Sequence, residues 1–443
     1  MSRYVSTRDS SISAEFRSVV FRGLAPDGGL YMPTETPMLS NALESCGSDI
    51  SFVELSERVL PLIFPDDIDE RTAADVARTA FPFAPQIHQL HERLSVLELF
   101  HGPSCAFKDF GASFLAHMME HYLGKGGEKA VILTATSGDT GSAVARAFHG
   151  RDNLEVVILY PSGRVSHLQE QQLTTLGGNV CALEVQGSFD DCQAMVKEVF
   201  QNEQARERYS LTSANSINLG RLLPQALYYL YAAVRLRPIA PEPVFSVPSG
   251  NFGNVCAGVL AWRWGMPARR FVAATNANDV VPEYLASGVY RPRPSVQTLS
   301  NAMDVGNPSN FERLASIFAS LEMPMTEMME SEVADDEQTL SEIRRVHSSY
   351  DYFVCPHTAT GTFAAEQYLS RNPNAHVVTL ATAHPAKFVE TVERAVGIAP
   401  EIPERLAESL QLPKQATLVP PNSTGLLEFL ADRYGDSFRR SSV

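Results

Sequence analysis

The chain has 443 residues, of which 44% are hydrophobic and 20% charged, and its formal net charge is −15. This length exceeds what one small core needs, so two or three lobes are expected, and the composition excludes a disordered chain. The negative charge argues against a nucleic-acid-binding surface, because phosphate backbones require clustered Lys and Arg, but a few local donors could still hold a small anionic substrate.

The N-terminus and the cysteines predict a cytoplasmic protein. The opening MSRYVSTRDSS lacks the apolar core of a signal peptide, and no apolar run is long enough to span a membrane. The six cysteines are scattered, with neither a CxxC pair nor zinc-type spacing, which is typical of reduced thiols in the cytosol. The sequence therefore predicts no metal site.

The first hundred residues have the pattern of turns and helices. The glycines and prolines of GLAPDGGLYMP predict a loop over 23–33. Apolar residues at helical spacing predict helices over 50–64 and 72–81, and less clearly over 86–94.

From residue 129 onward, strands and helices alternate. Apolar runs typical of buried strands occupy 129–136, 154–160 and 179–185, and helical patterns follow them at 140–150, 164–178 and 189–206. A long helix is expected over 217–236. Pro224 should kink or split it, because proline cannot donate the helical hydrogen bond.

A proline-rich segment at 237–243 is the expected linker, and the alternation resumes after it. Further strands are expected at 244–250, 270–276, 352–355 and 376–382, with helices at 253–265, 358–370 and 385–397. Apolar strands that alternate with helices indicate parallel βαβ units. The predicted fold class is therefore α/β, with two lobes, a ligand crevice at the carboxyl ends of the strands and a mainly helical N-terminal region. The boundaries we expect are 1–95 for the N-terminal region, 96–237 for the first lobe and 243–443 for the second.

The turn TSGDTGSA, at 136–143, stands where a strand passes into a helix. Free backbone N–H groups and hydroxyls at a helix start can bind a carboxylate or a phosphate. An ordinary helix cap with Asp139 or Thr140 as the capping residue explains the same pattern. Both interpretations stay open on spacing alone.

Two later turns have similar positions. In SVPSGNFGNVCAG, Gly250 and Gly253 would let the backbone approach a phosphate closely, although a plain strand-to-helix turn is the alternative. In LATAHPAKF, Thr382 ends an apolar strand and should face the crevice. His384 and Lys387 could add local positive charge there, or could simply be capping or solvated groups.

Lys108 stands among apolar and small residues in HGPSCAFKDFGASF, at the expected start of a helix. A snorkelling surface lysine explains it as a structural feature. Desolvation would instead favour the neutral amine, which can attack a carbonyl. The sequence has no HExxH or GxSxG motif, so an aldehyde cofactor is the partner that remains. Pyridoxal phosphate suits the loop at 250–254 through its phosphate and Thr382 through its ring nitrogen.

Taken together and in order, the motifs resemble the threonine synthase family, most closely its longer bacterial and fungal branch. The motifs that carry the resemblance are GPSCAFKDFGASF, TSGDTGSA, TSANSINLGRLLPQ, VPSGNFGNVCAG, AATNANDVVP, TLSNAMDVGNPSN and TAHPAKF, with the opening GLAPDGGLYMP. The resemblance spans about residues 3 to 395. It implies a fold-type-II pyridoxal-phosphate enzyme similar to the tryptophan synthase β chain.

The family pattern assigns roles to the matching positions. Lys108 would bind the cofactor covalently, and Thr382 would face its pyridine nitrogen. The cofactor phosphate would be held by Gly250, Asn251, Phe252, Gly253 and Asn254. The α-carboxylate of the substrate would be bound by Ser137, Gly138, Asp139 and Thr140. Asp139 would also lie near the cofactor hydroxyl, at a position where related fold-type-II enzymes often have Asn. The substrate phosphate would be contacted by Asn215, Ser216, Asn218 and Arg221.

The resemblance implies conversion of O-phospho-L-homoserine and water to L-threonine and phosphate, with closure of the lobes on the substrate. The protein is expected to be a monomer or homodimer without nucleic-acid or membrane partners. A phospho-lyase of the same lineage, releasing 2-oxobutyrate from phosphohomoserine or phosphothreonine, would carry the same motifs. A cofactor-binding protein without turnover and a dinucleotide-dependent oxidoreductase are two further alternatives, although Lys108 and Thr382 are both present and GxGxxG is absent.

Overall fold

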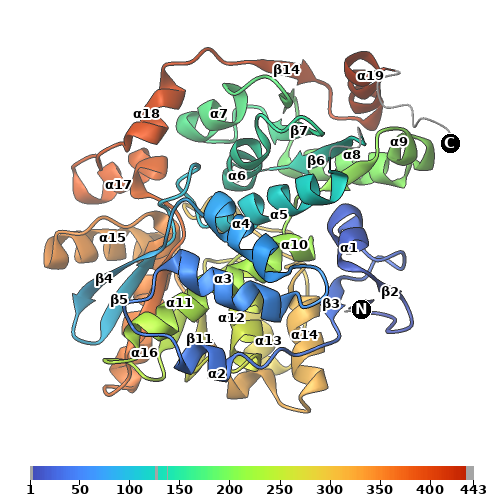
Figure 1. Ribbon diagram of the computed structural model, residues 1–443. Helices are drawn as coiled ribbons and strands as arrows, with labels where there is room; N and C mark the ends of the chain where they lie inside the picture. Colours follow the sequence, from blue (N-terminus) through green and yellow to red (C-terminus); the bar gives the residue numbers. More distant parts are fainter. Residues whose placement is uncertain (1–2, 125–127, 137, 436–443) are drawn as a thin grey trace.

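The computed structural model describes residues 3–124, 128–136 and 138–435. Its strands form three sheets, of which two are large and separated by helices (Figure 1). The predicted α/β class and the parallel βαβ units are confirmed by the pairing of these strands.

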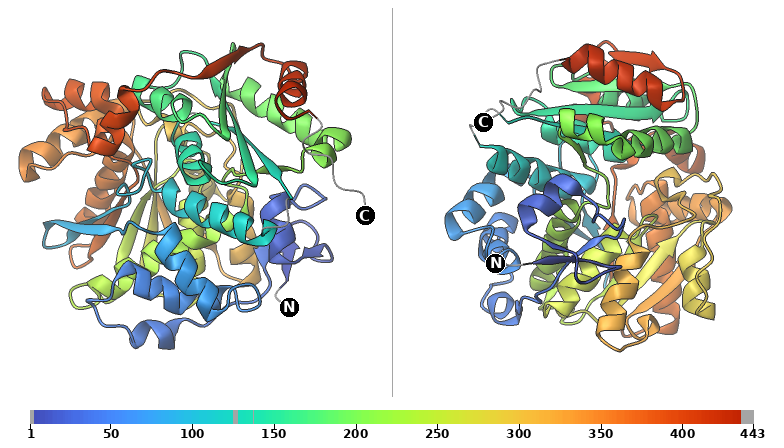
Figure 2. Two further views of the ribbon diagram at one scale, coloured as in Figure 1. Left: turned by 45° about the horizontal axis from the view of Figure 1, so that its top comes forward. Right: turned by 90° about the vertical axis from the view of Figure 1, so that its right-hand side faces the viewer.

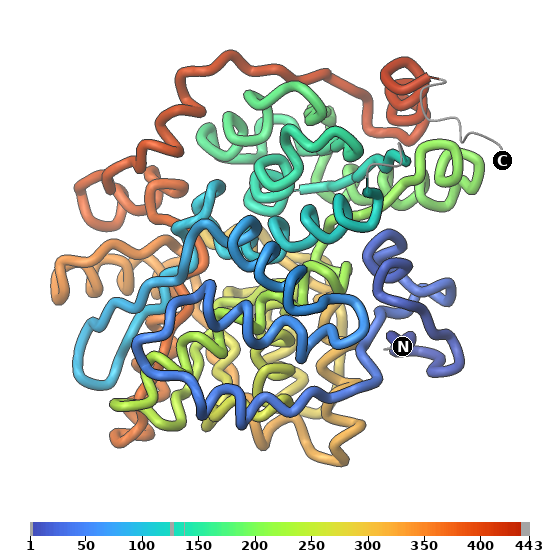
Figure 3. The backbone as a smooth tube through the Cα atoms, viewed as in Figure 1, coloured from blue at the N-terminus to red at the C-terminus, as the bar shows by residue number. Residues whose placement is uncertain are grey.

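The N-terminal region combines a small antiparallel sheet with four helices. The strands are β1 (Tyr4–Ser6), β2 (Ser13–Ala14) and β3 (Tyr31–Pro33), and the helices are α1 (Phe16–Arg22), α2 (Ser40–Glu44), α3 (Phe52–Ile63) and α4 (Glu70–Ala80). The helices predicted over 50–64 and 72–81 are confirmed by α3 and α4. Figure 3 shows this segment, in blue, crossing the face of the second lobe, where α3 packs on α11 (Ala226–Leu236).

The helix predicted over 86–94 is wrong. This segment forms β4 (Gln86–His91), which pairs antiparallel with β5 (Leu94–Glu98) at the edge of a sheet. The helical spacing of its apolar residues is weak, and backbone pairing with the buried strand β5 outweighs it.

The first lobe is built on a five-stranded parallel sheet in the order β14-β8-β7-β6-β9. Its strands are β6 (Ala130–Ala135), β7 (Leu154–Pro161), β8 (Val180–Val185), β9 (Leu211–Ser213) and β14 (Ala416–Val419). The accompanying helices are α5 (Lys108–Leu123), α6 (Asp139–Phe148), α7 (His167–Thr174), α8 (Phe189–Gln201), α9 (Glu203–Arg208) and α19 (Ser423–Tyr434). Strands β6 and β7 are almost wholly buried, as strands covered on both faces must be.

The second lobe is built on a six-stranded sheet in the order β12-β11-β10-β13-β5-β4, which is parallel except for the β4–β5 pair. Its other strands are β10 (Val244–Pro248), β11 (Arg270–Thr275), β12 (Met329–Val333) and β13 (Val377–Ala381). Its helices are α12 (Gly253–Arg263), α13 (Val280–Ser287), α14 (Phe311–Ser320), α15 (Asp336–Tyr350), α16 (Pro356–Arg371) and α17 (Val389–Val396), with the short 3-10 turns η2 (Asn301–Met303), η3 (Met325–Glu327) and η4 (Pro385–Phe388). The next helix, α18 (Glu404–Leu410), packs on α7 of the first lobe.

The strand predicted at 352–355 is also wrong, because this segment pairs with no strand and leads directly into α16. Two side chains of the segment have other roles. The Tyr352 hydroxyl donates to Glu98 Oε1 at 2.7 Å, and Cys355 Sγ accepts from the backbone N–H of Thr358 at the start of α16.

The expected effect of Pro224 is confirmed. The long helical segment divides into α10 (Leu219–Leu222), the 3-10 turn η1 (Leu223–Gln225) and α11. Helices α10 and α5 pack together between the two large sheets (Figure 1).

The strand pairing crosses the boundaries that the sequence suggests. β5 belongs to the sheet of the second lobe, whereas β14 and α19, from the end of the chain, join the first lobe. Figure 2 shows this C-terminal segment, in red, lying over the first lobe. Each lobe is therefore completed by chain from the other half of the sequence, and the boundaries at 95, 237 and 243 stay a prediction.

Within the described ranges, no helix combines the length and the apolar character needed to cross a bilayer.

Candidate active site

Lys108 is the first residue of α5, and backbone pairing places it beside the end of β13. The N–H of Leu99 donates to Ala381 O at 3.0 Å, and the N–H of Phe107 donates to Thr382 O at 2.8 Å. This ladder fixes the segment before Lys108 against the carboxyl end of a buried strand. The structure therefore brings together Lys108 and Thr382, which the sequence predicts as site residues.

The surroundings of Lys108 favour its neutral amine. The side chain keeps some contact with solvent but is otherwise enclosed by protein. Desolvation lowers the pKa of Lys108 to about 8, helped by the positive charges of Arg221 and Lys387 and opposed by Asp139. At pH 7 about a tenth of this lysine is thus deprotonated, far more than for an exposed lysine.

Asp139, at the start of α6, forms a buried ion pair with Lys387 of η4. The distance from Lys387 Nζ to Asp139 Oδ1 is 2.8 Å, and Gln169 Nε2 donates to the same oxygen at 3.1 Å. Burial alone would raise the pKa of Asp139, but the ammonium groups of Lys387 and Lys108 hold it well below its usual range. Asp139 is therefore a carboxylate in the centre of the molecule.

His357 connects this charge cluster to the glycine turn of the second lobe. It is buried, desolvation lowers its pKa to about 4, and its Nε2 accepts from the N–H of Ala302 at 3.1 Å. The segment containing Ala302 packs against Gly250, where an added Cβ would lie 2.6 Å from Met303 Cα. Gly250 is thus required by the close approach of two backbone segments.

The turn at 250–254 leads directly into α12. Phe252 precedes the helix in the left-handed conformation, with φ of 58°, which is uncommon for a residue other than glycine and is often found at functional sites. Asn254 shapes the turn from inside, because its Oδ1 accepts from Ser249 Oγ and its Nδ2 donates to Pro248 O. The N–H of Val255 donates to Asn254 Oδ1 at 2.9 Å, so the N–H groups of Gly253 and Asn254, at the very start of α12, are the ones suited to a phosphate.

Asn251 joins this turn to the predicted substrate loop. Its Nδ2 donates to Ser216 Oγ at 2.6 Å, and its Oδ1 accepts from the N–H of Ser309 at 2.6 Å. Asn310 Nδ2 then donates to the carbonyls of both Asn251 and Ser216, at 3.1 and 3.3 Å. Two predicted ligand loops are therefore held in contact.

Two residues of the segment 215–221 differ in their surroundings. Asn218 makes three hydrogen bonds to the backbone: it donates to Val20 O and Ser213 O and accepts from the N–H of Gly220. Its side chain shapes the loop.

Arg221 is buried, which lowers its pKa to about 10, and its Nε has no hydrogen-bond partner among the described residues. A buried cation with a free donor is suited to an anionic ligand.

A cleft of about 1840 Å³ is bordered by the first lobe, the N-terminal region and the turn of the second lobe. Its lining includes Thr140, Asn215, Ser216 and Asn251, but not Lys108. Thr382 and Arg221 are not among its lining residues either. Two of the predicted substrate-phosphate contacts, Asn215 and Ser216, thus face the open cleft, whereas Asn218, Arg221 and Lys108 are not among its lining residues.

The carboxylate turn is only partly described, since Ser137 lies outside the described residues. Gly138 adopts φ of +136°, and an added Cβ would meet the amide of Gln169 at 2.5 Å. Thr140 is half-buried at the cleft. This turn needs glycine for both conformation and space.

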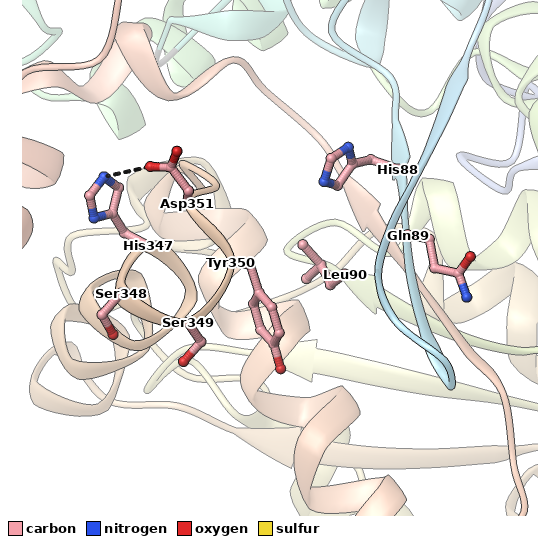
Figure 4. A pocket seen from close by; sticks show the side chains of 8 residues that line it. All are labelled: His88, Gln89, Leu90, His347, Ser348, Ser349, Tyr350 and Asp351. Carbon is pink, nitrogen blue, oxygen red and sulfur yellow. Dashed lines mark ion pairs between the residues drawn. The ribbon is translucent and has the colours of Figure 1, made fainter.

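A second depression, of about 620 Å³, lies between β4 and the end of α15 (Figure 4). It is lined by His88, Gln89, Leu90, His347, Ser348, Ser349, Tyr350 and Asp351. None of the predicted site residues contributes to it. Among the described residues, no group of three or more His, Cys, Asp or Glu side chains could hold a metal ion.

The sequence does not single out His357, Gln169 or Asn310, and it suggests Lys387 only as a source of local charge. Asn310 belongs to a motif that carries the family resemblance, NPSN, so a signal was present for it. The other three contribute through tertiary contacts, which spacing along the chain does not reveal.

Comparison with known proteins identifies the family of the chain. Residues 75–383 match the family model described as pyridoxal-phosphate dependent enzyme. Residues 3–81 match the threonine synthase N terminus, and residues 358–429 match the threonine synthase C-terminal model. The expected fold type is thereby confirmed.

Curated relatives and solved structures agree with the family models. Threonine synthase from Haemophilus influenzae is 42% identical over 399 residues, covering 90% of this chain and 92% of that protein. The Escherichia coli threonine synthase structure superimposes with a TM-score of 0.91 at 39% identity, covering 97% of this chain and all of the other. A pyridoxal-phosphate-bound threonine synthase from Brucella melitensis gives a TM-score of 0.89 at 36% identity, covering 98% and 99%. The chain therefore belongs to the threonine synthase family of pyridoxal-phosphate-dependent enzymes.

Proposed function

We propose that this chain converts O-phospho-L-homoserine and water to L-threonine and phosphate. The observation that carries the proposal is the desolvated Lys108 beside Thr382, in a cluster that also contains the buried Arg221. Membership of the threonine synthase family supports the substrate and the product.

The residues fit pyridoxal phosphate. Lys108 would hold its aldehyde carbon, and Thr382 would face its ring nitrogen. The turn Gly250, Asn251, Phe252, Gly253 and Asn254 would hold its phosphate, through the first N–H groups of α12. When bound, the cofactor supplies a ring that takes up the negative charge left at a carbon that loses its proton.

Lys108 is the proposed proton carrier of the reaction. Once the substrate amine replaces Lys108 on the aldehyde carbon, the freed amine, with its pKa lowered to about 8, would take the proton from Cα. It would return that proton to the bound substrate and cofactor before it takes a proton from Cβ. The ammonium form can deliver a proton to Cγ after phosphate departs. Because all three carbons are neighbours, one flexible side chain at the start of α5 can reach each of them in turn.

The other residues would bind the two ends of the substrate. The backbone of Ser137, Gly138, Asp139 and Thr140 would receive the α-carboxylate, because the Asp139 side chain is itself negative and is bonded to Lys387. Arg221, Asn215 and Ser216 would receive the phosphate. Asn218 would support them indirectly, because its side chain is bonded to backbone.

We further infer that the protein acts in the cytoplasm, as a monomer or homodimer, without nucleic-acid partners. The six free thiols and the acidic composition support this proposal. A phospho-lyase that releases 2-oxobutyrate is the alternative, since the same residues would serve its first steps.

Product analysis tests the proposal. Purified protein with pyridoxal phosphate and phosphohomoserine should release threonine and phosphate in equal amounts. Lys108→Ala should release neither while retaining the wild-type circular dichroism spectrum, because it removes no core volume. Release of 2-oxobutyrate without threonine would instead establish the phospho-lyase.

A further inference from the structure

A second lysine occupies the centre of the site. The side chain of Lys387 is 0% exposed, although lysine is almost never buried without a partner. Its Nζ lies 2.8 Å from Asp139 Oδ1 and donates to Ser104 O at 2.7 Å. Two fixed acceptors thus hold the ammonium group between α6 and the segment that leads to Lys108.

The acceptors are themselves immobilised. Gln169 Nε2 donates to Asp139 Oδ1 at 3.1 Å, and Gln172 Nε2 donates to Ser104 O at 3.2 Å, both from α7. The Ser104 N–H donates to Asp109 Oδ2 at 2.9 Å. Lys387 therefore has little freedom to move away from Asp139.

Lys108 shares the carboxylate of Asp139 with this second lysine. The charged and titratable groups that act on Lys108 are Asp139 from α6, Arg221 from α10, Lys387 from η4 and His357 from α16. Asp139 is the only negative charge in that set. A carboxylate bonded to Lys108 alone would favour its ammonium form, which can neither attack a carbonyl nor accept a proton.

We propose that Lys387 is a positioning residue that engages Asp139 and so leaves Lys108 free to lose its proton. The inference rests on the proposed role of Lys108 as the residue that binds the cofactor. Together, Asp139 and Lys387 then add no net charge beside Lys108. The positive charge of Lys387 offsets the attraction of Asp139 for a proton on Lys108.

The proton affinity of Lys108 tests this inference directly. The full-length chain, freed of cofactor, is mixed with pyridoxal at a series of pH values, and the rate of covalent capture is followed by visible absorbance. Borohydride trapping and peptide mass spectrometry identify the lysine that reacts. The pH midpoint of the capture rate reports the pKa of that lysine.

Lys387→Met should raise the midpoint by about one pH unit or more, because a neighbouring positive charge is lost and Asp139 becomes available to Lys108. Asp139→Asn should lower it. The double variant, which combines Lys387→Met with Asp139→Asn, should return the midpoint close to that of the wild type. An ion pair without net charge is there replaced by two uncharged side chains. An unchanged midpoint in Lys387→Met would overturn the inference.

The charge-matched double variant keeps the test decisive if either single variant fails to fold. Its midpoint should lie above that of Asp139→Asn, because only the latter retains Lys387 beside Lys108. If instead Lys387→Met alone folds, its comparison with the wild type decides. Equal midpoints in either comparison would overturn the inference.

Lys414→Met is the matched control. Lys414 also binds two oxygens, Glu170 Oε1 at 2.8 Å and Glu184 Oε2 at 2.6 Å, but it lies at the surface and does not act on Lys108. Its removal should leave the midpoint unchanged. Capture at a lysine other than Lys108 would contradict the proposed function itself, whereas capture at Lys108 with an unmoved midpoint would contradict only the role of Lys387.

Discussion

The two basic residues Lys108 and Arg221 differ in how their surroundings affect their charge. The neutral form of Lys108 depends on desolvation. Arg221, in contrast, is a cation that donates to Ala214 O and is attracted to Asp109, with no ion pair to a carboxylate among the described residues. A buried arginine with an unsatisfied Nε costs folding free energy. An anionic substrate would recover this cost on binding.

Arg221→Gln should therefore weaken substrate binding far more than it slows chemistry. Loss of a hydrogen bond between charged groups is worth about 1.5–3 kcal/mol, or a rise in KM of roughly 10- to 100-fold. Steady-state kinetics with phosphohomoserine and inhibition by inorganic phosphate measure the effect. Arg17→Gln is the control, because Arg17 is also an arginine but lies at an exposed position on the lining of the open cleft, whereas Arg221 is buried. A KM within twofold of the wild type for Arg221→Gln would rule out its proposed role.

How far the sequence predicts such residues depends on the kind of signal they carry. Lys108 is visible because it stands among apolar and small residues at a helix start, and Thr382 because it places a hydroxyl at the end of an apolar strand. Asn218 is predicted as a ligand because it shares a motif with Arg221, yet its amide bonds to the carbonyls of Val20 and Ser213, which a linear pattern cannot show. Lys387 is ambiguous for the same reason, since its acceptor Asp139 lies far away in the sequence.

At the scale of elements, α14 holds the ligand loops together through Arg313. This residue is buried and donates to Tyr31 O, Ile217 O and Asn310 Oδ1, at 3.1, 2.7 and 2.6 Å. It thereby ties the small N-terminal sheet to the substrate loop, and Asn310 extends the contact to the cofactor turn. One side chain thus connects three parts of the chain.

Arg313→Met should lower the free energy of unfolding by about 3 kcal/mol or more, because several buried carbonyls lose a charged donor. Urea unfolding followed by circular dichroism measures the loss. Arg8→Met removes the neighbouring exposed ion pair with Glu312 and should cost no more than about 1 kcal/mol. Similar losses in the two variants would show that Arg313 is not a special link.

Elements that the sequence predicts wrongly share one physical cause. β4 and the segment 352–355 both lie near the β5 edge of the second sheet. At such an edge, whether a segment becomes a strand depends on whether its backbone pairs with the adjacent strand. β4 pairs with β5, whereas Tyr352 uses its hydroxyl on Glu98 and remains outside the sheet. The largely apolar strands β6, β7, β8, β10, β11 and β13 are predicted correctly from their apolar runs. The buried interior strand β5 is missed, because the helix predicted over 86–94 ends at its first residue.

At the scale of the whole molecule, the end of the chain completes the first lobe. β14 pairs with β8, and α19 packs on α8 with Leu426 and Leu430 in a core that includes Val185. The sequence gives no function for this tail, since helical spacing does not reveal the sheet that a distant segment joins.

Leu430→Ala should destabilise the protein by about 2–5 kcal/mol through the cavity it leaves. Leu418→Ala, at a position of the tail that is 56% exposed, should have almost no effect. Thermal unfolding of the two variants compares them under the same conditions. Equal melting temperatures would mean that the tail is not part of the folded core.

The placement of β14 also affects how the protein folds while it is being translated. A ribosome releases the chain from its N-terminal end, so β6, β7 and β8 emerge long before residues 416–419. Until translation is nearly finished, the edge of β8 lacks its neighbour and offers unpaired backbone groups to other nascent chains. β14 and α19 thus cover an edge that would otherwise stay open, and termination of translation before residue 416 should yield aggregates instead of a slightly shortened enzyme.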